Sequence, residues 1–109
     1  MAAYVRGMLS VDNVADGDRV TVKVAGDIDL ASADKLTEAL EKAVAVASEV
    51  CVDLSQVTFL DSTGIRSLVQ AYRSAQSQGG ILYVDGARQW VAKVLDVTGV
   101  GPLLARPKS

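Results

Sequence analysis

The stretch VDLSQVTFLDSTGIRSLVQAYRSAQSQGG, residues 52–80, joins an apolar run to a helical pattern through a short polar loop. The apolar run begins slightly earlier, as EVCVDL at residues 49–54, and is almost continuous, which is typical of a strand covered on both faces. After the loop DSTG, four apolar side chains recur at helical spacing: Ile65, Leu68, Val69 and Tyr72. Gly79 and Gly80 then mark a helix end. The stretch is therefore predicted to fold as strand, loop and amphipathic helix.

The residues before this stretch predict a hairpin and another helix. VTVKVAG at residues 20–26 alternates apolar and other residues, as in a half-exposed strand. A weaker strand, GMLSVDNV, precedes it across the turn-forming ADGD. Residues 31–47 are expected to form an amphipathic helix that begins near Asp29 or Ser32. Its apolar face consists of Leu36, Leu40, Ala43, Val44 and Ala47.

The residues after the stretch predict one more strand and one more helix. ILYVDG at residues 81–86 is a second nearly continuous apolar run. Residues 87–100 have a helical pattern that stops at Gly99. The packed face of this helix is expected to be Trp90, Val91, Val94 and Leu95. Residues 101–109 are expected to form a short final strand or a tail.

Strands that alternate with helices predict an α/β fold with a mixed, mostly parallel sheet of four to five strands and amphipathic helices packed against it. We expect a single domain over residues 1–109, with its core at about 4–100 and a C-terminal tail at about 101–109. Right-handed crossovers bring the carboxyl ends of the parallel strands to one edge of the sheet. The loops GDIDL, SQVTFLDSTG and DGARQ meet at this edge, where ligands of open α/β sheets tend to bind.

Charge and composition limit the partners. The net charge is −2, and the 11 basic residues are scattered without a basic block. We therefore expect neither nucleic acid nor an anionic membrane as a direct partner. The segment MAAYVRGMLSV lacks a basic start followed by a long apolar run, and no segment approaches the roughly 18 apolar residues of a membrane span. A cytoplasmic location is expected.

The sequence contains no histidine, which argues against an enzyme. Its absence removes the usual general base, the usual zinc ligand and every Ser-His or Cys-His pair. LDSTG also lacks the glycine of a nucleophile elbow, and the chain has no phosphate-binding glycine loop. Cys51 is the only cysteine and is expected to be a buried structural thiol. We expect no catalytic residue, no cofactor and no metal.

The DSTG loop permits two roles at the start of the central helix. In the first, Asp61 or Ser62 caps the helix by accepting a hydrogen bond from a free backbone N–H group. In the second, Ser62 is phosphorylated, since a helix N-terminus presents free N–H groups and a favourable dipole to an anion. The local pattern by itself favours capping, and one residue could serve in both roles.

The wider pattern resembles the anti-sigma factor antagonists of the STAS-domain family. The resemblance runs from about residue 20 to residue 100: GDID, an amphipathic helix, the stretch at residues 52–80, a further strand, and a helix that ends in TGV. It implies a STAS-like fold. It also implies a regulatory binding protein, not an enzyme, that binds an anti-sigma factor and so frees a sigma factor.

The resemblance implies a role for each residue of the loop. Ser62 matches the residue that a partner, both anti-sigma factor and serine kinase, phosphorylates to release the complex, and a phosphoserine phosphatase reverses the modification. Asp29 matches the acidic residue of the loop after the second strand. Asp61, Thr63 and Gly64 match the rest of the motif. STAS modules of transporters or signalling scaffolds lack this phosphorylation switch, and such a module is the alternative function.

Several residues keep two interpretations at this point. Asp27 and Asp29 either cap the first helix or contact the partner. Arg66 is either a solvated charge or a partner contact, and the resemblance does not fix whether it or Arg73 faces the partner. Thr63 is a competing phosphate acceptor. Separately, Trp90 is expected in core or rim packing, with a recognition anchor as the other interpretation.

Overall fold

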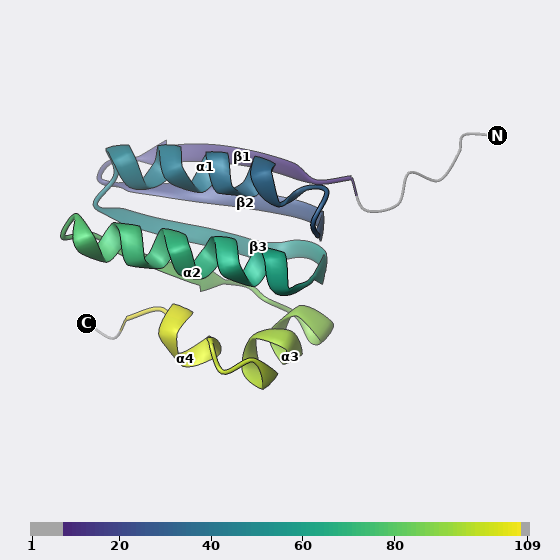
Figure 1. Cartoon of the computed structure of the whole chain (residues 1–109). Helices are drawn as coiled ribbons and strands as arrows, with labels where there is room; N and C mark the ends of the chain where they lie inside the picture. The colour runs from purple at the N-terminus through teal and green to yellow at the C-terminus, as the bar shows by residue number, and fades with distance from the viewer. Residues whose placement is uncertain (1–7, 108–109) are drawn as a thin grey trace.

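A computed structural model describes residues 8–107 as a four-stranded sheet with helices packed against it (Figure 1). The strands lie in the order β1-β2-β3-β4. Their bounds are β1 Ser10–Asp16, β2 Arg19–Ile28, β3 Glu49–Leu60 and β4 Ile81–Asp85. β1 and β2 form the predicted antiparallel hairpin, whereas β2, β3 and β4 are parallel. The predicted mixed, mostly parallel sheet is confirmed.

The two longest helices cover one face of this sheet. α1 (Ala33–Val46) and α2 (Ser62–Ser77) lie side by side along the strands (Figure 1). Each has one buried apolar side, as its sequence period predicts. α3 (Gln89–Val97) and α4 (Gly101–Leu104) follow β4. None of the helices within residues 8–107 is long and apolar enough to cross a bilayer.

The core lies between the sheet and α1 and α2. Val22, Val50 and Leu82 are fully or almost fully buried on the inner face of three adjacent strands. On the opposite face Cys51 pairs with Tyr83 across β3 and β4, and both side chains are buried. The prediction of strands covered on both faces is therefore confirmed at these central positions, and the predicted burial of Cys51 is confirmed with it.

The C-terminal segment differs from the prediction of a strand or tail. Residues 101–104 form the short helix α4, with Pro102 in its first turn. Leu104 is fully buried and belongs to the hydrophobic core, so the core extends past residue 100. Beyond it, the Arg106 guanidinium lies 5.0 Å from the centre of the Tyr83 ring and donates a hydrogen bond to the Tyr83 hydroxyl. These contacts hold the segment against β4.

Candidate functional site

The three loops that follow β2, β3 and β4 lie at one end of the sheet, which we call the carboxyl rim (Figure 1). β3 is the longest strand and continues past the end of β4, since Asp53 pairs with Asp85 while β3 runs on to Leu60. The N–H of Asp61 donates a hydrogen bond of 3.2 Å to the carbonyl of Ile28, which ties the loop after β3 to the end of β2. The segments after β2 and β3 therefore meet as predicted, and residues 88–91 line a cleft with residues 55–58. The prediction that residues 55–60 are loop is wrong, because they continue β3 and pair with the end of β2.

Asp61 is the residue that caps α2. Its carboxylate Oδ1 accepts hydrogen bonds from the Thr63 N–H at 2.9 Å, from the Thr63 hydroxyl at 2.5 Å and from the Gly64 N–H at 3.4 Å. Partial burial favours the neutral form of Asp61, but the hydrogen bonds from the Thr63 hydroxyl and the backbone N–H groups of Thr63, Gly64 and Leu30 outweigh it and lower the pKa. The capping role that the sequence left between two residues belongs to Asp61.

Ser62 is left exposed at the first position of α2. Within residues 8–107 its hydroxyl has no hydrogen-bond partner. Thr63, by contrast, is half-buried, and its hydroxyl is held by Asp61. Of the two adjacent hydroxyls, that of Ser62 is the more accessible to another protein, and it lies where the helix dipole favours an added negative charge.

Gly64 is buried, which does not suit a direct partner contact. A Cβ atom there would lie 2.4 Å from Cγ2 of Ile28 and 2.5 Å from Cδ1 of Leu60. Glycine therefore lets the first turn of α2 pack directly on the ends of β2 and β3. Gly64 shapes the site by close packing.

Asp29 supports the start of α1. Its Oδ1 accepts hydrogen bonds from the N–H and the hydroxyl of Ser32, both at 3.1 Å, and the Ser32 hydroxyl accepts one from the Asp29 N–H at 3.0 Å. The Asp29 carbonyl accepts the N–H of Ala33 at 2.8 Å. Asp29 is only half-buried, so part of its side chain remains exposed on the rim while it makes these hydrogen bonds.

Asp27 lies deeper than Asp29 and is almost fully buried. It is 8% exposed, and its Oδ1 accepts a hydrogen bond of 2.6 Å from the hydroxyl of Thr58 on β3. The single hydroxyl hydrogen of Ser32 is shared between the Asp27 carbonyl, at 2.9 Å, and Oδ1 of Asp29, at 3.1 Å. Asp27 thus positions the loop after β2 from within. Sequence reasoning missed Thr58, whose partner is distant in the chain.

Two further hydroxyls, also missed from the sequence, join the helices below the rim. Ser67 of α2 is buried, and its hydroxyl lies 2.8 Å from that of Thr37 of α1. It also donates to the carbonyl of Thr63 at 3.2 Å. This pair fixes the first turns of α2 against α1, and its only signal in the sequence was a polar residue on a helix face that is otherwise apolar.

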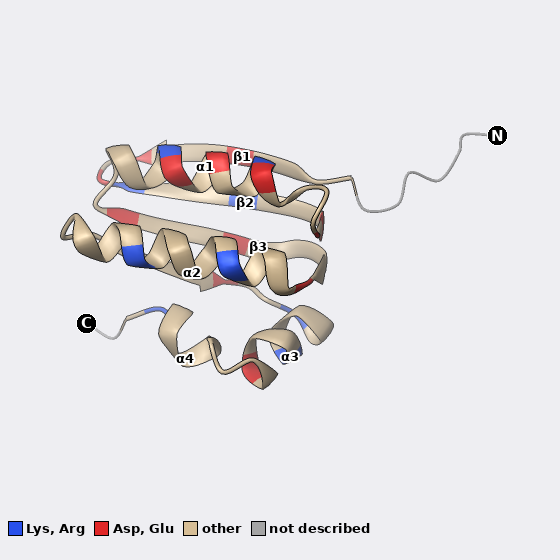
Figure 2. Ribbon diagram, in the orientation of Figure 1, with Lys and Arg blue, Asp and Glu red and all other residues tan. Residues whose placement is uncertain are grey.

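The charged side chains of the rim form no continuous patch. Arg66 and Arg73 are exposed on α2 and have no ion pair within residues 8–107. Figure 2 shows basic and acidic positions interspersed over the ribbon, with no basic face. Across the same residues, no group of three or more acidic or cysteine side chains is arranged to hold a metal ion.

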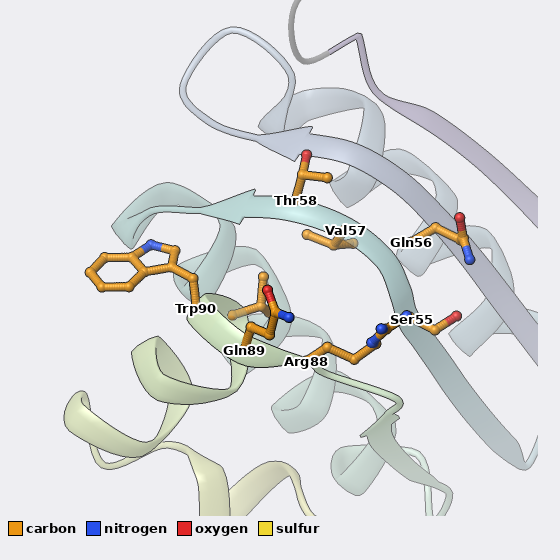
Figure 3. Close-up of a pocket in the computed structure, with 8 residues that line it drawn as sticks. Ser55, Gln56, Val57, Thr58, Arg88, Gln89 and Trp90 are labelled. Atoms are coloured by element: carbon orange, nitrogen blue, oxygen red, sulfur yellow. The ribbon is translucent and has the colours of Figure 1, made fainter.

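Trp90 departs from the core packing expected for its helix. It is 57% exposed, while Val91 and Leu95 supply the buried side of α3. Beside it lies a cleft of about 270 Å³ between β3 and the start of α3 (Figure 3). Its lining is Ser55, Gln56, Val57, Thr58, Arg88, Gln89, Trp90 and Val91.

Known proteins share this sequence pattern and fold. The family described as Mlab, STAS domain matches residues 11–105. An anti-sigma-B factor antagonist from Listeria monocytogenes is 31% identical over 90 residues, covering 82% of this chain and 79% of the relative. The corresponding antagonist from Bacillus subtilis is 27% identical over 96 residues, 88% of each chain.

Solved structures with the same fold include the unphosphorylated anti-sigma factor antagonist SpoIIAA, with a TM-score of 0.76, 15% identity, and 94% of this chain and 89% of that chain covered. A sulfate transporter family protein from Wolinella succinogenes has a TM-score of 0.71 at 21% identity, with coverage of 84% and 75%. The chain therefore belongs to the STAS-domain family, among the relatives of the anti-sigma factor antagonists.

Proposed function

We propose that this protein is an anti-sigma factor antagonist that binds an anti-sigma factor and thereby releases a sigma factor. Phosphorylation of Ser62 by that same partner, acting as a serine kinase, ends the interaction, and a phosphoserine phosphatase restores it. The protein acts in the cytoplasm as a regulatory binding protein and supplies no catalytic group. The ATP is bound by the kinase.

The observation that carries this proposal is the contrast between Ser62 and its neighbours. Asp61 caps the helix and Thr63 is bonded to that cap, so the exposed Ser62 hydroxyl is free of any structural task within residues 8–107. A phosphate added there would change the rim surface without breaking a hydrogen bond of the fold. The relationship to anti-sigma-B factor antagonists supports the choice of partner.

The test combines the purified anti-sigma factor kinase with this protein and ATP. We expect one phosphate, found on Ser62 by fragment mass spectrometry. Ser62→Ala should bind the kinase equally with and without ATP, whereas Thr63→Ser should still be modified at residue 62. Phosphate confined to residue 63, or normal ATP-driven release of Ser62→Ala, would contradict the proposal.

A second candidate is a STAS regulatory module of a transporter or signalling scaffold without the switch. The observation that favours it is the fold shared with the sulfate transporter family protein. A protein of this type would bind its partner irrespective of kinase and ATP, and Ser62→Ala would have no effect on regulation.

A further inference from the structure

Two large exposed apolar side chains lie on the carboxyl rim, one on either side of the Ser62 loop. Leu30, in the loop after β2, is 79% exposed, and Trp90, in the first turn of α3 after β4, is 57% exposed. The strand order β2-β3-β4 places the loop after β3, which holds Ser62, between them. An exposed tryptophan beside a cleft is a typical anchor of a protein interface.

The backbone that presents Trp90 is strained. Gln89 has a φ of 45°, in the left-handed region that residues other than glycine, asparagine and aspartate rarely occupy. Such a conformation persists where the surroundings enforce it, and it is concentrated at functional sites. Gln89 is the first residue of α3, and it lines the cleft with Arg88 on one side, while Ser55 and Thr58 of β3 line the other (Figure 3).

A protein contact of ordinary size that includes Ser62 is large enough to reach Trp90. A stable complex covers roughly 800 Å² on each partner, which corresponds to a disc of about 16 Å radius. The cleft beside Trp90 is lined by Thr58, four residues before Ser62 along the chain, and four residues of strand span at most about 13 Å. The cleft therefore lies within the radius of a contact of this size centred on Ser62.

We infer that Trp90 and its cleft form a second contact area for the anti-sigma factor kinase, with Leu30 completing the surface on the other side of Ser62. This inference rests on the proposed function and assigns separate roles to two residues. Trp90 provides affinity by burying its indole against the partner, and Ser62 provides the switch. The polar lining of the cleft and the Arg88 cation suit an acidic or amide side chain of the partner, packed beside the indole.

The separate roles of Trp90 and Ser62 lead to a quantitative prediction, because phosphorylation changes Ser62 and leaves Trp90 chemically unchanged. Trp90→Ala should weaken binding of the unphosphorylated protein by about 30-fold, the effect of truncating a central interface tryptophan. It should weaken binding of the phosphorylated protein by a similar factor. The ratio of the two affinities, which measures the switch, should stay within about threefold of the wild-type ratio.

The experiment is calorimetric titration of the purified anti-sigma factor kinase with wild type, Trp90→Ala, Trp90→Phe and Val97→Ala. Val97 is the matched control, since it is 74% exposed at the other end of α3 and away from the rim. Trp90→Phe should recover part of the affinity and Val97→Ala should bind as wild type. Circular dichroism and thermal unfolding of each variant keep a binding loss separate from a folding loss.

A spectroscopic measurement tests the same contact without a substitution. Trp90 is the only tryptophan of the chain, so labelling with 5-fluorotryptophan gives one ¹⁹F signal. We expect this signal to shift on addition of the kinase, because the exposed indole becomes buried. An unchanged signal in a complex that forms, together with unchanged affinity of Trp90→Ala, would overturn the inference while leaving the Ser62 switch intact.

Two other outcomes are distinguishable. If the wild-type protein does not bind the kinase at all, the proposed function fails and this inference fails with it. If the ¹⁹F signal shifts with the concentration of the protein alone, and Trp90→Ala abolishes a dimer seen by sedimentation, the surface joins two copies of this chain and the inference is wrong.

Discussion

The hydroxyl of Thr63 donates a hydrogen bond of 2.5 Å to the carboxylate of Asp61, which leaves the Ser62 hydroxyl as the unbonded one of the two within residues 8–107. Capping and the proposed modification thus fall on adjacent residues. The fold depends on Asp61 and Thr63, and the surface of the rim can change at Ser62 without loss of a structural contact.

The first prediction concerns the stability of variants at these positions. Asp61→Ala should lower the free energy of unfolding by about 1 kcal/mol, within the range of 0.5 to 2 kcal/mol for loss of an N-cap. Ser62→Ala should change it by less than about 0.5 kcal/mol, because the side chain is exposed and alanine suits a helix. Urea unfolding at pH 7 measures both, and a larger loss for Ser62→Ala would show that Ser62 is part of the cap.

The second prediction is a dependence on pH. The folded state lowers the pKa of Asp61, so it favours the carboxylate. This contribution is complete above the pKa of the unfolded chain, about 3.9 for aspartate, and is lost as the pH falls through the lower pKa of the folded state. Asparagine also caps helices but does not titrate there. The difference in melting temperature between wild type and Asp61→Asn should therefore change below about pH 4, in the direction that disfavours wild type. A difference that stays constant from pH 7 to pH 3 would contradict the assignment.

The third prediction tests the close packing at Gly64. Gly64→Ala should lower the free energy of unfolding by about 1 to 3 kcal/mol, as overpacking of a core does. The new Cβ atom would overlap Ile28 and Leu60, which are 0% and 2% exposed and have little room to move. Ser77→Ala, at the exposed end of the same helix, is the control and should be nearly neutral. Equal stability of the two variants would show that the strand ends can shift to admit a methyl group.

The sequence was sufficient to predict the order of strands and helices from β1 to α3 and the carboxyl rim. The signals were local or topological: alternation in residues 20–26, helical spacing in α1 and α2, and the rule for parallel crossovers. Such signals can be recognised without knowledge of tertiary contacts. Ser62 was placed on the rim by the same reasoning. That Ser62 takes no part in the helix cap could not be predicted, because Asp61 and Ser62 are both good capping residues.

What the sequence did not predict depends on contacts between distant residues. α4 is a single turn of four residues, too short to show a helical period, and the burial of Leu104 requires the packed sheet. The bond from Thr58 to Asp27 joins residues 31 positions apart. Trp90 follows the apolar pattern of α3, yet Val91 and Leu95 supply the buried side of that helix, with Val94 partly buried beside them, and Trp90 is exposed.

The last prediction concerns whether phosphorylation of Ser62 changes the stability of the fold or the affinity for the partner. A phosphoserine carries a charge of about −1.5 to −2 at neutral pH. At the start of α2 the helix dipole favours it by roughly 0.3 to 1 kcal/mol, while the neighbouring Asp61 carboxylate repels it, so the two local effects oppose each other. Across a packed interface a desolvated phosphate or a new like-charge contact costs several kcal/mol.

The interface effect is the larger one, so phosphorylation should alter binding much more than folding. The phosphorylated protein should keep its circular dichroism spectrum and melt within a few degrees of the unmodified protein. Its affinity for the anti-sigma factor kinase should fall at least about 100-fold, equivalent to roughly 2.7 kcal/mol. Ser62→Asp, with a smaller charge, should reproduce only part of this loss, and Thr63→Ser, which keeps a hydroxyl at residue 63, should behave as wild type. Calorimetric titration of the kinase with the phosphorylated and the unmodified protein measures this difference. Equal affinities, or a phosphorylated protein that has unfolded, would mean that Ser62 does not act as a switch at the interface.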